Sequence, residues 1–146
     1  MKIAINTSIL GCTENSGLHV YLNNFLENLS RIDSRNEYSL LYSSLRRKAS
    51  QMPGPVNGNF YKSVLPIPNV KLPFKNLFSD NVIMPNFLKK NKYDIYHAPW
   101  GFSLPRIKGV KKILTIHDLR TLKISDGNYP QDIKSLKKAI ELADVC

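Results

Sequence analysis

Apolar and polar positions change their spacing twice within the first 44 residues of the chain. Residues 2–10 are a short apolar run in which three apolar residues follow one another directly. Such a run is typical of a strand that is buried on both faces of a sheet. A polar loop with a glycine at each end follows at residues 11–17, and a second apolar run occupies residues 37–44.

Between the loop and the second run, apolar residues recur at helical spacing. The spacing of three and four residues predicts an amphipathic helix over residues 18–32, with Ser16 as its N-cap. Strand, loop, helix and strand in this order are the βαβ unit of a parallel sheet. The apolar positions of the helix are Val20, Leu22, Phe25, Leu26, Leu29 and Ile32.

The remainder of the chain continues this alternation. Residues 74–90 carry a broken helical pattern in which Pro85 ends one helix or begins another, and residues 131–143 predict a final helix. The other expected strands are residues 59–66, 93–97 and 112–117, and the loops between the elements are residues 46–58, 98–109 and 120–130. The sequence therefore predicts an α/β fold, a three-layer Rossmann-like domain with a mostly parallel sheet.

Composition and charge narrow the class of protein. The 146 residues are 42% apolar and 22% charged, which excludes a disordered or fibrous chain and fits one domain. The net charge is +10, of which residues 1–45 contribute −1 and the remaining residues +11. A basic surface suits an anionic partner, such as nucleic acid, phospholipid or a phosphorylated substrate.

Cysteine usage and hydropathy bear on the compartment. Neither Cys12 nor Cys146 has a second cysteine or a histidine at metal-ligand spacing, and a reducing cytosol is the simplest interpretation. No apolar run reaches the length of a membrane helix, and Asn6 interrupts the N-terminal apolar run before a signal peptide could form. We therefore expect a cytoplasmic protein.

Two basic segments carry an alternative interpretation. The preferred interpretation of residues 46–58 is a solvated loop. The alternative is a contact with an anionic acceptor or with membrane headgroups. Residues 74–90 fit core packing first, although their basic and aromatic composition also suits the surface of a membrane. Peripheral contact with an anionic membrane, at the inner membrane face, is therefore one expectation.

Three features follow strands of the expected parallel sheet, where ligands of such sheets bind. The first is the loop that leads through Gly17 into a helix N-terminus, which attracts anions but matches no phosphate-binding motif. The second is His97, with Trp100 shortly after it, and the third is the pair His117 and Asp118. An imidazole there can hydrogen-bond to a substrate hydroxyl or phosphate, and Asp118 can orient a ring or accept from a sugar hydroxyl.

Other chemistry for the same residues stays open. A metal site or a small hydrolase built from His97, His117 and Asp118 is conceivable, but their spacing matches no known ligand pattern and no G-x-S-x-G segment occurs. A non-catalytic module that binds nucleic acid or anionic lipid is the alternative that the net charge favours. Against nucleic acid, the lysines do not alternate with aromatic residues as a stacking platform would require.

The order of the motifs resembles the family 4 glycosyltransferases. Residues 16–21, SGLHVY, are similar to the family's SGIGRY; YDIYHAPW and KILTIHDL resemble its next two strands, and AIELADVC resembles a later helix end. The resemblance implies half of a GT-B architecture, with residues 1–146 as the N-terminal, acceptor-binding domain. It further implies transfer from a nucleotide-sugar donor to a glycan or lipid-linked acceptor, as in polysaccharide biosynthesis, with retention and without a metal ion.

The resemblance also implies roles for single residues. Ser16 and Gly17 would lie near the donor phosphates and the acceptor, and His97 and Trp100 would bind substrate. His117 would approach the transferred sugar as a catalytic residue, and Asp118 would support it.

The chain departs from the family at three points. His19 and Val20 stand where the family has glycine and arginine, which puts the function of the Gly17 loop in question. The third departure is length, and we expect a fragment that lacks the last strand of its domain and the C-terminal donor-binding domain. A separate chain is one source of the missing donor-binding domain. Such a fragment should be inactive alone, because catalysis needs the donor and the acceptor held together.

Overall fold

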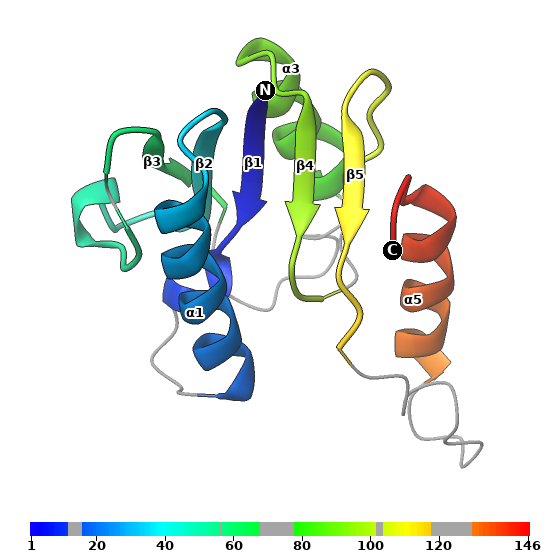
Figure 1. Cartoon of the computed structure of the whole chain (residues 1–146). Helices are drawn as coiled ribbons and strands as arrows, with labels where there is room; N and C mark the ends of the chain where they lie inside the picture. The colour runs from blue at the N-terminus through cyan, green and yellow to red at the C-terminus, as the bar shows by residue number, and fades with distance from the viewer. Residues whose placement is uncertain (12–15, 56, 68–77, 102–103, 118–129) are drawn as a thin grey trace.

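A parallel sheet forms the centre of the molecule in a computed structural model that describes residues 1–11, 16–55, 57–67, 78–101, 104–117 and 130–146 (Figure 1). Five strands make up the sheet: β1 (Lys2–Asn6), β2 (Glu37–Ser43), β3 (Phe60–Leu65), β4 (Ile95–Ala98) and β5 (Lys111–Leu114). The helices are α1 (Gly17–Ile32), α3 (Met84–Lys90) and α5 (Pro130–Leu142), with shorter turns η1 (Ser8–Gly11), η2 (Ala49–Gln51) and η3 (Ser79–Ile83).

The strands are ordered β3-β2-β1-β4-β5, and each neighbouring pair is parallel. Ala4 marks the register at the centre, since it lies opposite Ser39 of β2 and Tyr96 of β4. The predicted α/β fold with a Rossmann-like parallel sheet is therefore confirmed.

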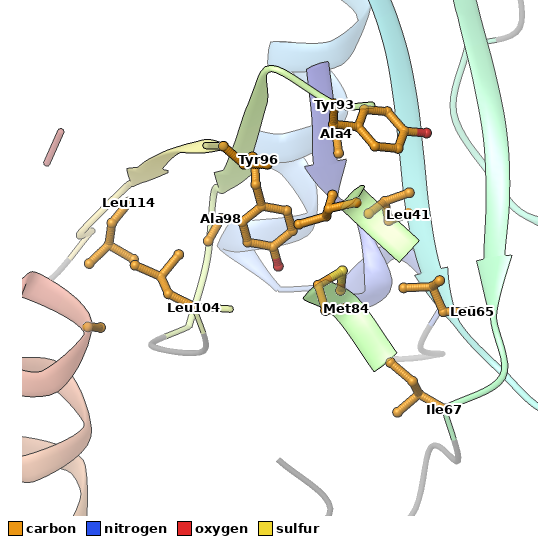
Figure 2. Close-up of a cluster of buried hydrophobic side chains, with 13 residues drawn as sticks. Ala4, Leu41, Leu65, Ile67, Met84, Tyr93, Tyr96, Ala98, Leu104 and Leu114 are labelled. Atoms are coloured by element: carbon orange, nitrogen blue, oxygen red, sulfur yellow. The ribbon is translucent and has the colours of Figure 1, made fainter. Parts of the chain in front are cut away.

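Each face of the sheet carries its own apolar cluster. Because successive side chains of a strand point to opposite faces, Ile5 of β1 packs with α1 on one side, whereas Ala4 packs with α3 on the other. Figure 2 shows part of the second cluster, where residues from all five strands meet Met84 of α3. The labelled strand residues of this cluster include Ala4, Leu41, Leu65, Tyr96, Ala98 and Leu114.

Helix α1 forms over the predicted residues and most of its predicted apolar positions pack in the cluster on its face of the sheet, but Val20 is 60% exposed. Leu22 and Leu26 are buried against the sheet, whereas Ile32 at the end of the helix is 81% exposed. Ser16 occupies the N-cap position as predicted, but its hydroxyl forms no capping bond with the backbone and instead contacts the His19 imidazole.

The structure corrects several expected boundaries. The first strand ends at Asn6 rather than at residue 10, because residues 8–11 turn into η1. The basic loop of residues 46–58 is tied to the core, since Met52 is buried and the Tyr42 hydroxyl donates to the Pro53 carbonyl. Pro85 begins a helix, as one of its two expected roles, because it lies in the first turn of α3, directly after the π-helical turn η3.

The C-terminal residues extend the sheet beyond β5. Val145 forms a parallel bridge with Ile113, and its carbonyl accepts the Leu114 N–H at 2.9 Å. The Asp144 carboxylate lies 3.1 Å from Lys112 Nζ and also accepts the Lys112 N–H. Within the described part of the chain, no helix has the length and apolar character that crossing a membrane requires.

The packing of α1 predicts where truncation of a side chain is costly. Leu26→Ala should lower the free energy of unfolding by about 3 kcal/mol, because the lost leucine leaves a cavity in a fully buried site. Ile32→Ala on the same helix is the matched control and should cost about 0.5 kcal/mol or less, since Ile32 is exposed. Urea unfolding followed by circular dichroism measures both changes, and equal losses would contradict this packing.

Candidate functional site

The sheet reverses its winding direction between β1 and β4. From β1 the chain crosses to β2 and β3 on one side, and it then returns past β1 to β4 and β5 on the other. In open parallel sheets, ligands bind beyond the carboxyl ends of the strands at the point where the order reverses. The candidate site is therefore the edge where β1 and β4 end side by side and where α1 begins nearby (Figure 1).

Side chains with hydrogen-bonding groups follow one another along β4 and β5 on the face that carries α1. His97 in β4, and Thr115 and His117 after β5, occupy odd positions, whereas the even-numbered Tyr96 and Leu114 pack in the cluster on the opposite face. The period of two in a strand places these three residues on the face of α1. The two imidazole rings contact aromatic residues of helix α1, which agrees with this placement.

His97 is held inside the molecule. Its side chain is only 9% exposed, its Nε2 shares a hydrogen bond of 2.9 Å with the Thr115 hydroxyl, and its ring meets the Phe25 ring edge-on at 5.6 Å. Burial lowers the pKa of His97 to about 4, so the imidazole is neutral near pH 7. His97 therefore links β4 to the end of β5, and its contact with substrate remains a prediction.

His117, in contrast, is exposed at the edge of the sheet. Its Nε2 lies 2.7 Å from the Pro99 carbonyl oxygen, and because a carbonyl can only accept, Nε2 must carry the proton. In the neutral form of the ring, Nδ1 is then the acceptor. Tyr21 of α1 meets the same ring edge-on at a centroid distance of 4.5 Å. The orientation of the imidazole is thus set from two sides, by a backbone carbonyl and by an aromatic ring.

Trp100 ties β4 to β1. Its indole N–H donates to the Asn6 carbonyl at 3.2 Å, and its half-buried ring packs against the cluster on the α1 face. This contact joins the two strands at the point where the winding reverses. Trp100 therefore shapes the candidate site, although its indole nitrogen is already engaged.

Gly17 is the first residue of α1 and is exposed. A Cβ built on Gly17 would meet no other atom within 4 Å, so packing does not require a glycine here. A helix start that is open in this way has N–H groups and a positive dipole end available to an anion. The predicted anion site at Gly17 thus has the space that it needs.

His19, which departs from the family pattern, turns into the interior. It is 8% exposed, and its Nδ1 lies 3.1 Å from the Ser16 hydroxyl. Its Nε2 is a buried nitrogen without a hydrogen-bond partner among the described residues. Because the ring is buried, it stays out of the open space around Gly17.

Asp118 lies outside the described residues. Within the described ranges, no group of three or more His, Cys, Asp or Glu side chains is arranged to hold a metal ion. The conceivable metal set of His97, His117 and Asp118 includes the undescribed Asp118, so this set stays untested.

Three residues at this edge escaped sequence reasoning as site residues. Phe25 belonged to the helical pattern, whereas Tyr21 entered only as part of the SGLHVY segment. Their spacing of four residues places both on the helix face that meets the two imidazoles. Thr115 lies two residues before His117, so the period of a strand could have placed both side chains on one face.

Comparison with known proteins adds no further identification. No protein-family model matches the chain, and no curated protein matches it. The geometry of the site therefore carries the functional argument.

The buried state of His97 predicts a pH-dependent stability. The unfolded chain binds a proton at His97 below about pH 6.5, whereas the folded chain binds it only below about pH 4, so stability falls as the pH drops between these values. Between about pH 7.5 and about pH 5, His97 should account for a loss of about 2 kcal/mol.

The control for this prediction is His97→Gln, which keeps a hydrogen-bonding group near Thr115 but does not titrate. Urea unfolding of both proteins at the two pH values isolates the contribution of His97, because all other titrating groups are shared. An equal loss of stability in both proteins would show that His97 is not buried as described.

Proposed function

We propose that the chain forms the acceptor-side half of a retaining glycosyltransferase. The observation that carries the proposal is an oriented, exposed His117 that meets Tyr21, one helical turn after the open helix start at Gly17, beside the strand ends where the winding of the sheet reverses. Rossmann-like sheets host many activities, so the proposal depends on these groups rather than on the fold.

His117 supplies the chemistry of sugar recognition at this edge. With Nε2–H engaged by the Pro99 carbonyl, Nδ1 accepts a hydrogen bond from a hydroxyl of the transferred sugar. Two contacts already fix the orientation of the ring, so the side chain loses less conformational entropy when a ligand binds. Asp118, next in the chain, would hold the loop that carries this imidazole.

Gly17 supplies the complementary group for a phosphate. The open start of the 16-residue helix α1 suits the negative charge of a nucleotide-sugar or of a phosphorylated acceptor. Ser16 adds a hydroxyl at the same place, whose oxygen is held by the His19 ring. Sugar recognition and phosphate recognition are thus assigned to two segments of one edge.

Transfer also needs a wall that binds the donor. By resemblance, a second Rossmann-like domain provides it, in the same polypeptide or in a separate chain, and no metal ion takes part. We expect no turnover from these 146 residues alone, because stabilisation of the transition state requires donor and acceptor in one closed site. Their own share is the binding and orientation of one substrate.

Ligand titration tests this proposal directly. The ¹⁵N-labelled chain should show amide shifts concentrated at residues 16–21, 97–101 and 114–117 on addition of nucleotide-sugars, hexose phosphates or oligosaccharides at millimolar concentration. Gly17→Ala and His117→Gln should each weaken binding about tenfold, because one adds a Cβ in the open space and the other removes the imidazole acceptor.

The stability of Gly17→Ala tests whether this variant is folded. Gly17→Ala should change the free energy of unfolding by about 0.5 kcal/mol or less, since the added Cβ meets no atom within 4 Å. Tyr61→Phe, at an exposed residue of the edge strand β3, serves as the control for binding. Shifts spread over the whole surface, or no shift with any of these ligands, would contradict the proposal.

A further inference from the structure

One stripe of exposed residues runs along the outer face of η3 and α3. Ser79, Met84 and Leu88 are buried against the sheet, so the opposite side of this helical stretch faces solvent. The exposed positions are spaced by three and four residues, as one face of a helix requires. They are Phe78, Val82, Asn86, Lys89 and Lys90.

We call the whole stripe the α3 outer face. Its beginning is apolar. Phe78 is 58% exposed and Val82 is 40% exposed, one helical turn apart. A helix that faces only water usually presents polar side chains at such positions. Exposed apolar residues that are rimmed by charge mark surfaces of interaction with a protein or a membrane.

The end of the stripe is basic, and its charge is not neutralised. Lys89, Lys90 and Lys92 are exposed, and Lys108 is exposed shortly before β5, at the same end of the sheet. None of these four lysines takes part in an ion pair within the described part of the chain.

The nearby carboxylates are engaged elsewhere. Asp80, within η3 itself, accepts the Ser79 hydroxyl at 3.1 Å. Glu37 pairs with Lys2, Asp144 pairs with Lys112, and the Asp94 carboxylate accepts the backbone N–H of Lys2. The dipole at the end of α3 favours Lys89 and Lys90, but it does not account for the lysines beyond the helix.

We propose that the α3 outer face docks on an anionic lipid bilayer. Phe78 and Val82 would enter the boundary between headgroups and acyl chains, and the lysines would meet anionic headgroups. Nucleic acid fits the stripe less well, because base stacking needs aromatic residues among the cations. Phe78 lies at the far end of the stripe from Lys90, about 18 Å away at the rise of a helix.

The docking would also orient the candidate site. Helix α3 ends shortly before the amino end of β4, so η3 at the other end of this helical stretch lies toward the carboxyl edge of the sheet, which carries His117. That edge would then lie beside the membrane, where a lipid-linked acceptor is presented. This last step rests on the proposed function, whereas the docking itself does not.

Vesicle co-sedimentation of the full chain tests the docking. Vesicles of two parts phosphatidylcholine and one part phosphatidylglycerol should bind the protein at low salt, and binding should fall as salt is added. Lys89→Gln with Lys90→Gln should lower the partition coefficient about 25-fold, at about fivefold for each lysine. Phe78→Ser should lower it about tenfold by removing the inserted ring.

Matched controls lie on helix α1, which covers the opposite face of the sheet, and in the turn that follows this helix. Arg31→Gln with Arg35→Gln removes the same charge, Ile32→Ser removes an exposed apolar side chain, and both should bind vesicles within about twofold of the parent chain. Circular dichroism establishes that each variant is folded.

Several results would overturn the proposal. They are an absence of vesicle binding, equal binding to pure phosphatidylcholine, and an equal loss in the α1 controls. A fourth is displacement from vesicles by a short oligonucleotide whose own binding needs Lys89 and Lys90 but not Phe78, which would assign the surface to nucleic acid. Because the vesicles contain no sugar, these results are independent of ligand shifts at His117.

Discussion

Strand β1 is paired on both of its long edges, with β2 on one side and with β4 on the other, and both pairings are parallel. A parallel neighbour requires a crossover connection, so the chain must leave β1 over one face of the sheet and return to β4 over the other. Helix α1 therefore packs on one apolar cluster and α3 on another. The central position of β1 thus determines that helices cover both faces of the sheet. It also determines the edge at which the strand order reverses.

The edge is fixed by hydrogen bonds between strand ends together with the packing of helix α1 on the two imidazoles. The Asn6 carbonyl accepts the Trp100 indole N–H, and the Pro99 carbonyl accepts the His117 imidazole N–H. Asn6 is the last residue of β1 and Pro99 directly follows β4, so side chains satisfy carbonyl groups at the ends of these strands. The same bonds that satisfy the backbone orient the side chains a ligand would meet.

The two imidazoles at this edge differ because of their surroundings. His97 is desolvated beside Phe25 and stays neutral, which makes it a fixed link between β4 and Thr115. His117 is exposed, and one of its nitrogens remains available to a ligand. One ring of the pair stabilises the edge, and the other is presented by it.

Most of the fold could be predicted from the sequence because it depends on local periodicity. Helix α1 leaves a clear repeat of apolar residues every 3.6 positions, and the buried strands of the parallel sheet leave nearly continuous apolar segments. Strand ends were less predictable, as η1 shows, because a short turn uses the same apolar residues as a strand.

The site could be predicted only in part. Its location followed from the rule for parallel sheets, but the contacts of Tyr21 and Phe25 with the imidazoles depend on how α1 is placed on the sheet. Nor could the sequence distinguish a buried His97 from an exposed His117, since both follow an apolar strand. That difference arises from tertiary packing, which leaves no local signal.

The most direct test of this account is a nuclear Overhauser spectrum of the ring protons in the labelled chain. The account predicts cross-peaks between Tyr21 and His117 and between Phe25 and His97, because helix α1 and the ends of β4 and β5 meet at one edge. If the His117 ring protons show contacts to neither Tyr21 nor the Pro99 region, the edge is not assembled as described.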